Sequence, residues 1–198
     1  MKRISLLLVL AFAMIRPAHA QQATVITGFL GAQFFDTDAP LETSPVLGMR
    51  WAWFARNGHG FEMTLDYTET RVEASQLSSI LGLSFDDPQA IPEQLLRIAL
   101  DYGYVGRGGV VRPYVTAGVG FLDANLVLSN RAERILANLN REVDTHDSSI
   151  TYEAGAGVLV GEERLRFRYD MRIVRIDHLL TYGGTTTYQT SGGICWVF

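Results

Sequence analysis

The feature that most constrains the fold is a strict alternation of apolar and polar residues in segments of about ten residues. In residues 165–173 the odd positions are apolar, whereas the even positions carry Arg166, Arg168, Asp170 and Arg172. Residues 61–68 alternate in the same way. Because a period of two places alternate side chains on opposite faces of a sheet, these segments predict β-strands with one apolar face and one charged face.

The same test predicts a strand in eight segments, of which the first alternates least cleanly. They are Ala23–Phe35, Pro45–Ala55, Gly60–Val72, Gln94–Val105, Val110–Leu122, Ser149–Val160, Arg164–Ile176 and Thr185–Phe198.

The predicted connections alternate in length. Residues 56–59, 106–109 and 161–163 are short and include the tight-turn pairs Asn57-Gly58 and Gly108-Gly109, whereas residues 73–93 and 123–148 are long. Short turns on one rim and long loops on the other are typical of an antiparallel up-and-down transmembrane β-barrel with both termini in the periplasm. Helical spacing predicts short helices at 75–83 and 131–143, the second capping the barrel mouth in preference to binding a partner.

The N-terminus has the three parts of a secretory signal. Lys2 and Arg3 precede an apolar stretch at residues 4–15, and Ala18-His19-Ala20 forms a small-residue cleavage site. We therefore expect cleavage near Ala20, with residues 21–198 forming one barrel domain. No later segment has the ~20 continuous apolar residues of a membrane helix.

The charge balance excludes one class of partner. Of the 17 basic residues, Lys2, Arg3 and Arg16 lie in the expected signal, which leaves 14 basic residues, all arginine, against 21 acidic ones. An acidic domain lacks the basic patch that nucleic-acid binding needs.

The charged faces of the predicted strands form the main candidate site. They carry Arg50, Glu62, Asp66, Arg97, Asp101, Arg112, Glu153, Arg166, Arg168, Asp170 and Arg172. An eight-stranded barrel has room inside for little more than its own side chains, and unpaired charges there cost several kcal/mol each. We therefore expect a closed lumen network of ion pairs, with a narrow arginine-lined anion pathway as the alternative.

Aromatic residues and glycines fit the same architecture. Trp51, Trp53, Tyr67, Tyr102, Tyr104, Tyr152, Tyr188 and Trp196 fall on the apolar faces, as in the aromatic girdle of a membrane barrel. Gly118, Gly120, Gly155 and Gly157 fall on the charged faces, where they would allow close packing. Cys195 is the one cysteine and is expected to be a packing residue, with an intermolecular disulfide as a minor alternative.

No catalytic, cofactor or metal site is expected. The histidines at 59, 146 and 178 are scattered and show no metal-ligand spacing. His146-Asp147-Ser148 joins the residue types of a hydrolase triad, but adjacency in sequence is not triad geometry.

The C-terminal residues carry the most specific resemblance. Gly193, Trp196 and Phe198 match the assembly signal of bacterial outer-membrane barrels, and residues 112–121 and 152–158 are similar to glycine-rich strands of the OmpA membrane domain and OmpX family. The resemblance implies the bacterial outer membrane as location, outer-membrane lipids as surroundings, and the barrel-assembly machinery as a partner during insertion.

The functional expectation is non-enzymatic. We expect an envelope-structural role or surface interaction through the long loops, with a possible extracellular partner. The alternatives are a lipid-modifying hydrolase with His146 or His178 beside a Ser and a carboxylate, a narrow channel, and an exported lipocalin-like barrel whose apolar faces line a ligand cavity.

Overall fold

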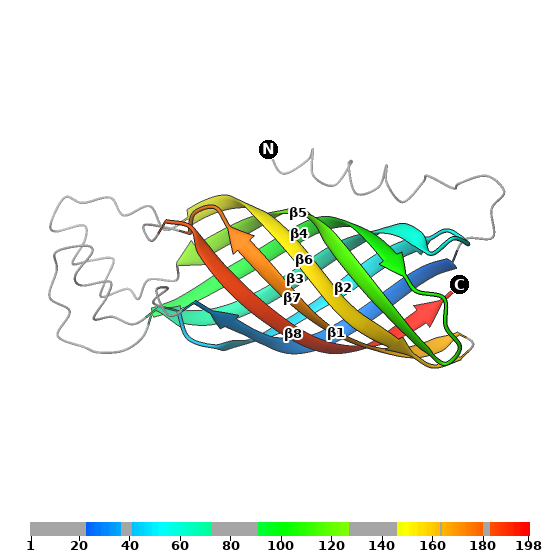
Figure 1. Cartoon of the computed structure of the whole chain (residues 1–198). Helices are drawn as coiled ribbons and strands as arrows, with labels where there is room; N and C mark the ends of the chain where they lie inside the picture. Colours follow the sequence, from blue (N-terminus) through cyan, green and yellow to red (C-terminus); the bar gives the residue numbers. More distant parts are fainter. Residues whose placement is uncertain (1–22, 37–40, 73–90, 127–145, 163, 180–182) are drawn as a thin grey trace, which may run out of the picture.

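The chain folds into one closed antiparallel sheet, as predicted. The computed structural model describes residues 23–36, 41–72, 91–126, 146–162, 164–179 and 183–198. The strands are β1 (Ala23–Phe35), β2 (Ser44–Phe54), β3 (His59–Val72), β4 (Ile91–Val105), β5 (Val111–Leu126), β6 (His146–Val160), β7 (Leu165–Ile176) and β8 (Thr185–Val197). Each strand pairs with its neighbours in sequence, and β1 pairs with β8 to close the barrel (Figure 1).

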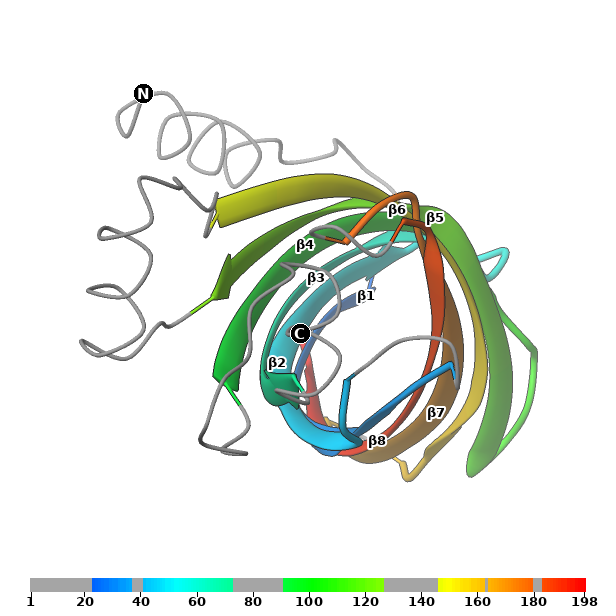
Figure 2. The same cartoon turned by 90° about the vertical axis from the view of Figure 1, so that its left-hand side faces the viewer.

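The two ends of the barrel differ as the connection lengths predict. Residues 55–58, 106–110 and 161–164 connect strands at the end where the C-terminus lies, which we call the short-turn end (Figure 1). Gly58 and Gly161 adopt φ angles of 91° and 133° in two of these turns, a region that favours glycine. Residues 73–90 and 127–145 connect strands at the opposite, long-connection end, which faces the viewer in Figure 2. The predicted signal and the predicted helices at 75–83 and 131–143 lie outside the described residues.

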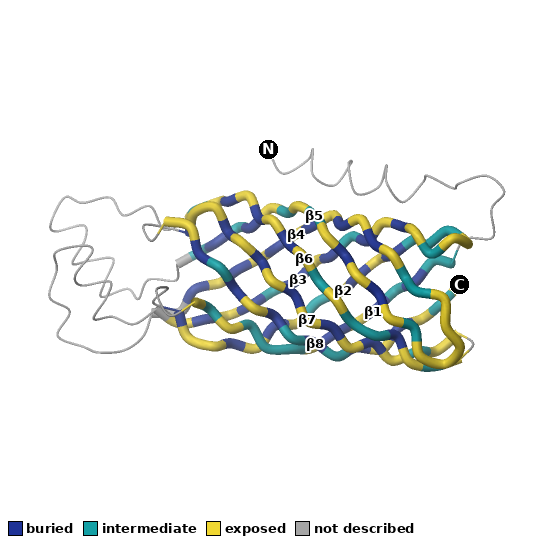
Figure 3. The backbone as a smooth tube through the Cα atoms, in the orientation of Figure 1, coloured by how far each residue is buried: buried dark blue, intermediate teal, exposed yellow. Residues whose placement is uncertain are grey.

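Burial alternates along every strand, so the wall has an apolar outside (Figure 3). The outward side chains include Leu30, Met49, Phe61, Leu65, Ile98, Leu100, Val115, Val119, Phe121, Ile150, Phe167, Met171, Ile173 and Ile194. An exposed apolar belt around a whole barrel suits a lipid surround and would cause aggregation in water. Within the described residues, no helix is long and apolar enough to cross a membrane.

Aromatic side chains gather on the outer wall near the short-turn end. Tyr102, Tyr104, Trp196 and Phe198 are exposed there. The Tyr102 hydroxyl lies 2.6 Å from Nδ1 of His59, and the two rings stack. Rings with one polar edge are favoured where hydrocarbon meets water, so this cluster marks one membrane boundary.

Three strands extend further at the long-connection end than the hydrophobic pattern predicts. β4 begins at Ile91 instead of Gln94, β5 continues to Leu126 instead of Leu122, and β6 begins at His146 instead of Ser149. The outward residues of the β5 and β6 extensions are polar, among them Asp123, Asn125, His146 and Ser148. The backbone ladder therefore continues past the apolar belt, where a hydrophobic alternation no longer marks it.

An apolar plug fills the lumen at the short-turn end. It consists of Val25, Ala52, Tyr114, Leu159 and Cys195, with Phe54, Val105 and Val197 packed against it. The inward-facing Val25 of β1 belongs to this plug, and Phe29 is also buried inside. Apolar residues on both faces explain why this strand alternates least cleanly in the sequence.

Gly157 makes room for the largest ring of the plug. Tyr114 and Gly157 are opposite each other in the β5–β6 register. A Cβ atom on Gly157 would lie 2.6 Å from the Tyr114 hydroxyl oxygen and 2.7 Å from its Cζ. It would lie closer still to the backbone carbonyl oxygen of Tyr169. The Tyr114 ring and this carbonyl therefore occupy the space where a side chain at residue 157 would stand.

We predict that Gly157→Ala destabilises the barrel by about 1–3 kcal/mol, the usual cost of overpacking a filled interior. Gly28→Ala is the control, because a Cβ atom there would meet no atom within 4 Å. The measurement is the temperature at which the compact band is lost in a heat-dependent gel mobility assay. Equal loss in both variants would show that the contacts of residue 157 with Tyr114 and the Tyr169 carbonyl are not what excludes a side chain.

Candidate functional site

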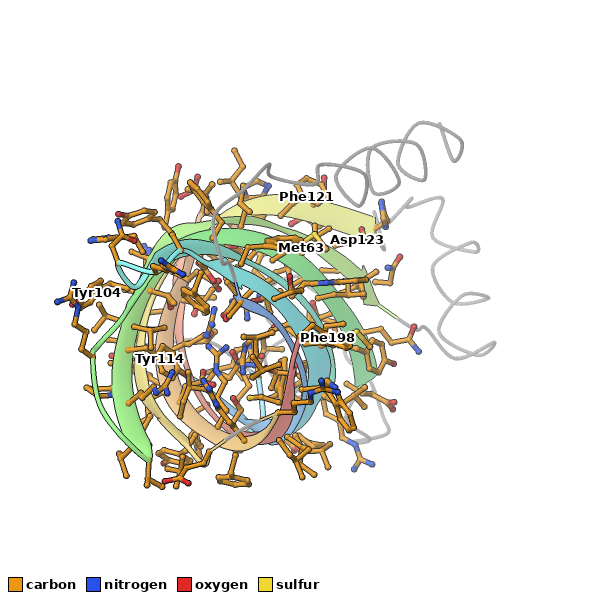
Figure 4. The ribbon with its side chains drawn as sticks, turned by 90° about the vertical axis from the view of Figure 1, so that its right-hand side faces the viewer. Met63, Tyr104, Tyr114, Phe121, Asp123 and Phe198 are labelled. Atoms are coloured by element: carbon orange, nitrogen blue, oxygen red, sulfur yellow. The ribbon has the colours of Figure 1, made fainter. Side chains whose placement is uncertain are left out.

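A network of buried charges fills the middle of the lumen, above the apolar plug. It contains nine of the eleven predicted residues: Arg50 from β2, Glu62 and Asp66 from β3, Arg97 and Asp101 from β4, Glu153 from β6, and Arg168, Asp170 and Arg172 from β7. All nine are buried. Figure 4, viewed from the short-turn end, shows nitrogen-bearing side chains across the barrel interior.

Arg172 is the centre of the network. Its Nη1 donates to Asp101 Oδ2 at 2.7 Å and to Glu153 Oε1 at 2.9 Å. Its Nε donates to Asp170 Oδ1 at 3.2 Å, and its Nη2 donates to Glu62. One guanidinium thus joins carboxylates from β3, β4, β6 and β7, a use of its planar array of donors that a lysine cannot match.

Arg97 extends the network toward the long-connection end. Its Nε donates to Asp66 Oδ2 at 3.2 Å, and its Nη1 donates to Glu153. Its Nη2 also donates to the side-chain oxygen of Gln189 at 3.1 Å. Arg97 therefore connects β3, β6 and β8.

Arg50 and Arg168 join the network to aromatic rings of the interior. Arg50 donates to Asp170 Oδ2 at 2.7 Å, and its guanidinium carbon lies 3.7 Å from the centroid of the Phe29 ring. Arg168 donates to Glu62 Oε1 at 3.0 Å and to the Tyr114 hydroxyl at 2.7 Å. The Tyr114 phenol therefore joins the charged layer to the plug below it.

Glycines of β5 and β6 provide the space for these long side chains. A Cβ atom on Gly155 would lie 2.9 Å from Cγ of Arg172, and one on Gly118 would collide with Asp101. On Gly120 it would lie 2.6 Å from the Thr151 hydroxyl. The four inward glycines of the sequence pattern are thus close-packing positions.

The network is almost neutral and almost fully paired. Its four arginines face five carboxylates, and Oδ1 of Asp101 and Nε of Arg50 have no hydrogen-bond partner among the described residues. Removing one member of such a buried pair typically costs about 3–5 kcal/mol, because the other charge stays behind in a low-dielectric interior. The arrangement acts as a rigid polar filling, and it holds no nucleophile.

Arg112 and Arg166 do not join the network, contrary to the expectation from their strand faces. Both are half-buried near the short-turn end, below the charged layer. Arg112 Nε donates to the Gly109 carbonyl at 3.3 Å, and Arg166 Nε is buried without a hydrogen-bond partner in the described part of the chain. Their inward direction follows the pattern, but the apolar plug separates them from the carboxylates.

The sequence prediction missed Glu93. This residue lies in the β4 extension, faces the lumen and is fully buried, and neither carboxylate oxygen has a hydrogen-bond partner among the described residues. A period of two counted back from Arg97 through Leu95 would have found it. The predicted strand begins only at Gln94, where the clear apolar alternation starts.

The histidines take part in contacts at the ends of the barrel. His146 and Ser148 face outward whereas Asp147 is partly buried, so the three consecutive residues do not assemble into a triad. His178 instead lies 3.4 Å from the Ser149 hydroxyl through Nδ1 and 3.4 Å from Asp147 Oδ1 through Nε2. His146 contacts Asp123 at 3.3 Å and Asn125 at 2.8 Å on the outer wall.

The residues of the C-terminal motif take two different positions. Gly193 faces the lumen, where a Cβ atom would lie 2.5 Å from the Gly28 carbonyl and 2.9 Å from Cβ of Phe29. Trp196 and Phe198 face outward, with ring centroids 6.5 Å apart. Cys195, between them, is fully buried in the plug and accepts a hydrogen bond from the Thr27 hydroxyl at 3.2 Å.

Solved structures share this architecture. Neisserial surface protein A aligns with a TM-score of 0.59 at 13% identity, over 89% of this chain and 97% of the other. The N-terminal barrel domain of Pseudomonas aeruginosa OprF aligns at 0.51 and 15% identity, over 91% and 100%. Ail, the attachment invasion locus protein of Yersinia pestis, aligns at 0.50 and 14% identity, over 88% and 98%, in a structure with the heparin analogue sucrose octasulfate. At these identities the likeness shows the fold alone.

Similarity in sequence defines the family. No curated protein sequence matches the chain significantly. The model of the outer membrane protein beta-barrel domain matches residues 4–198, which is nearly the whole chain. That match, together with the closed eight-stranded barrel and its apolar outer wall, leads to one conclusion: the chain belongs to the outer-membrane β-barrel family.

Proposed function

We propose that this barrel is a non-enzymatic protein of the outer membrane that acts through its long-connection end, as a surface-interaction or envelope-structural element. One observation carries the proposal: side chains fill the lumen. The plug, the ion-pair network and a layer that includes Thr68, Thr70 and Thr187 follow one another along the axis. A filled lumen leaves the two rims and the outer wall as the surfaces that can act.

Filling of the lumen also separates this proposal from the narrow-channel alternative. Four of the six arginines that would line an anion pathway are bound to carboxylates, and Arg172 alone contacts four carboxylates. An anion passing through would have to displace these buried pairs. We infer that the lumen has a structural role.

Charge favours one kind of surface partner. In the family the long connections face the outside. Acidic residues outnumber basic ones there: the described residues are Asp36, Glu42, Glu69, Asp123, Asp147 and Asp177 against Arg71 and Arg175. Residues 73–90 and 127–145 add Glu73, Asp86, Asp87, Glu133, Glu142 and Asp144 against Arg131, Arg134 and Arg141. This end suits a positively charged partner, whereas the polyanion held by Ail has the opposite charge.

A filled lumen predicts no ion conduction. We expect the purified barrel to insert into planar lipid bilayers without unitary current steps at any applied polarity. The folded state of the same sample is checked by its heat-dependent gel mobility. Reproducible unitary current steps that disappear when Arg168 is replaced by glutamine would establish a channel and contradict a filled lumen.

The acidic end predicts binding to a polycation. In nanodiscs of zwitterionic lipid, we expect the barrel to bind a fluorescent oligoarginine peptide and not a heparin fragment. Binding of the peptide should weaken as the salt concentration rises. A combined variant that replaces Asp36 and Asp177 by Asn, and Glu42 and Glu69 by Gln, should bind the peptide severalfold more weakly. The control is Glu162→Gln at the opposite rim. Tighter binding of heparin than of the peptide would contradict the proposed partner chemistry.

A second candidate, a lipid hydrolase, is favoured by the contacts of His178 with Ser149 and Asp147 at the rim. The same contacts also form a structural clasp. The Ser149 hydroxyl oxygen accepts the backbone N–H of His178 at 3.1 Å, and the residue is only 3% exposed. A buried serine held by the main chain ties β6 to the end of β7, and a substrate would have difficulty reaching it.

One variant separates the two roles. If the contacts between Ser149 and His178 are structural, Ser149→Ala should lower the free energy of unfolding by about 1 kcal/mol through the lost hydrogen bonds. Neither the variant nor the parent protein should then release fatty acid from ester-linked lipids. The assay follows free fatty acid by mass spectrometry. Release by the parent protein that is lost in both Ser149→Ala and His178→Ala would establish the hydrolase.

A further inference from the structure

Two arginines at the short-turn end have no carboxylate partner in the described part of the chain. Arg112 and Arg166 are the first inward-facing residues of β5 and β7, the strands on either side of β6. Arg112 donates a hydrogen bond to the backbone carbonyl of Gly109, and Nε of Arg166 is buried with no hydrogen-bond partner among the described residues. Every arginine of the central network, by contrast, contacts at least one carboxylate.

The register places the two side chains at the same end of the lumen, on the two strands that flank β6. Leu159 of β6 is the register partner of Arg112 on one side and of Arg168 of β7 on the other. Arg166 is the inward residue of β7 that precedes Arg168, so it lies nearer the short turn. Two like charges placed together and left unpaired are unfavourable unless an anion lies between them.

The surroundings increase the attraction for an anion. Leu159 and Cys195, the register partners of Arg112 and Arg166, belong to the apolar plug, which closes one side of the pair to water. Exposed Arg56, Arg107 and Arg164 stand in the three short turns of the same rim. Against them the described residues provide Glu162 and the terminal carboxylate of Phe198.

We propose that Arg112 and Arg166 form an anion site at the short-turn mouth of the barrel that binds a phosphate group. Two guanidinium groups offer paired N–H donors that match phosphate oxygens, and the dry plug behind them strengthens the charge-assisted hydrogen bonds. Outward Tyr102, Tyr104 and Trp196 mark the nearby membrane boundary, so phospholipid headgroups lie at the same level as this mouth. The phosphate can therefore come from a headgroup or from the aqueous phase.

The test uses the full barrel in a zwitterionic detergent and compares two double variants of equal charge change. Arg112→Gln with Arg166→Gln removes the site, whereas Arg107→Gln with Arg164→Gln removes two turn arginines of the same rim. Heat-dependent gel mobility confirms that each variant is folded. Native mass spectrometry then measures retained adducts after addition of inorganic phosphate or of short-chain phosphatidylglycerol.

We expect the parent protein to retain at least one of the two probes and the Arg112/Arg166 variant to bind it at least about tenfold more weakly, because charge-assisted hydrogen bonds are lost. The turn variant should keep most of the binding. Retention of phosphatidylglycerol alone assigns the site to headgroups, and retention of inorganic phosphate as well assigns it to phosphate in general. No retained adduct, or equal weakening in both variants, would overturn the proposal.

Discussion

The constraint on which the structure depends is the closure of the sheet between β1 and β8. In hydrocarbon an unpaired backbone N–H or C=O costs several kcal/mol, so a strand edge exposed to lipid is excluded. Closing eight strands fixes a narrow barrel whose interior must be filled by its own side chains. The inward glycines, the apolar plug and the paired arginines all follow from that limited space, and the outer wall is left to the lipid.

The sequence alone predicts the fold well because the signal is repeated. A period of two specifies which face each residue takes, and the pattern found the strand containing Arg168, Asp170 and Arg172 almost to the residue. It was weakest where the two faces are chemically alike, as in β1 with its inward Val25 and Phe29, and where the wall leaves the membrane. Periodicity also predicts whether a side chain points into the barrel, but it does not predict the position of that side chain along the barrel axis. It placed Arg112 and Arg166 inside the barrel, but only the register shows that the plug separates them from the carboxylates.

The charges of this chain are sorted along the barrel axis. Acidic residues collect at the long-connection end, the middle is nearly balanced, and arginines outnumber carboxylates among the described residues of the short-turn end. Because arginine keeps its charge at any pH that a cell envelope meets, the positive rim is permanent. Arginine therefore has two roles in this barrel: in the interior it is bound in ion pairs, and at the short-turn end it provides positive charge that attracts anions.

The central network has a consequence for how the barrel reaches its folded state. The carboxylates around Arg172 come from four strands, and Arg97 bridges to a fifth through Gln189. No single hairpin can satisfy these groups, because the carboxylates of β3 and β4 meet the arginines of β7 only across the lumen, so a half-curled sheet would hold unpaired charges beside hydrocarbon. The ion pairs form only once β3 and β4 face β6 and β7 across the lumen, which makes a partly curled sheet unstable and couples the two halves of the chain into one cooperative unit.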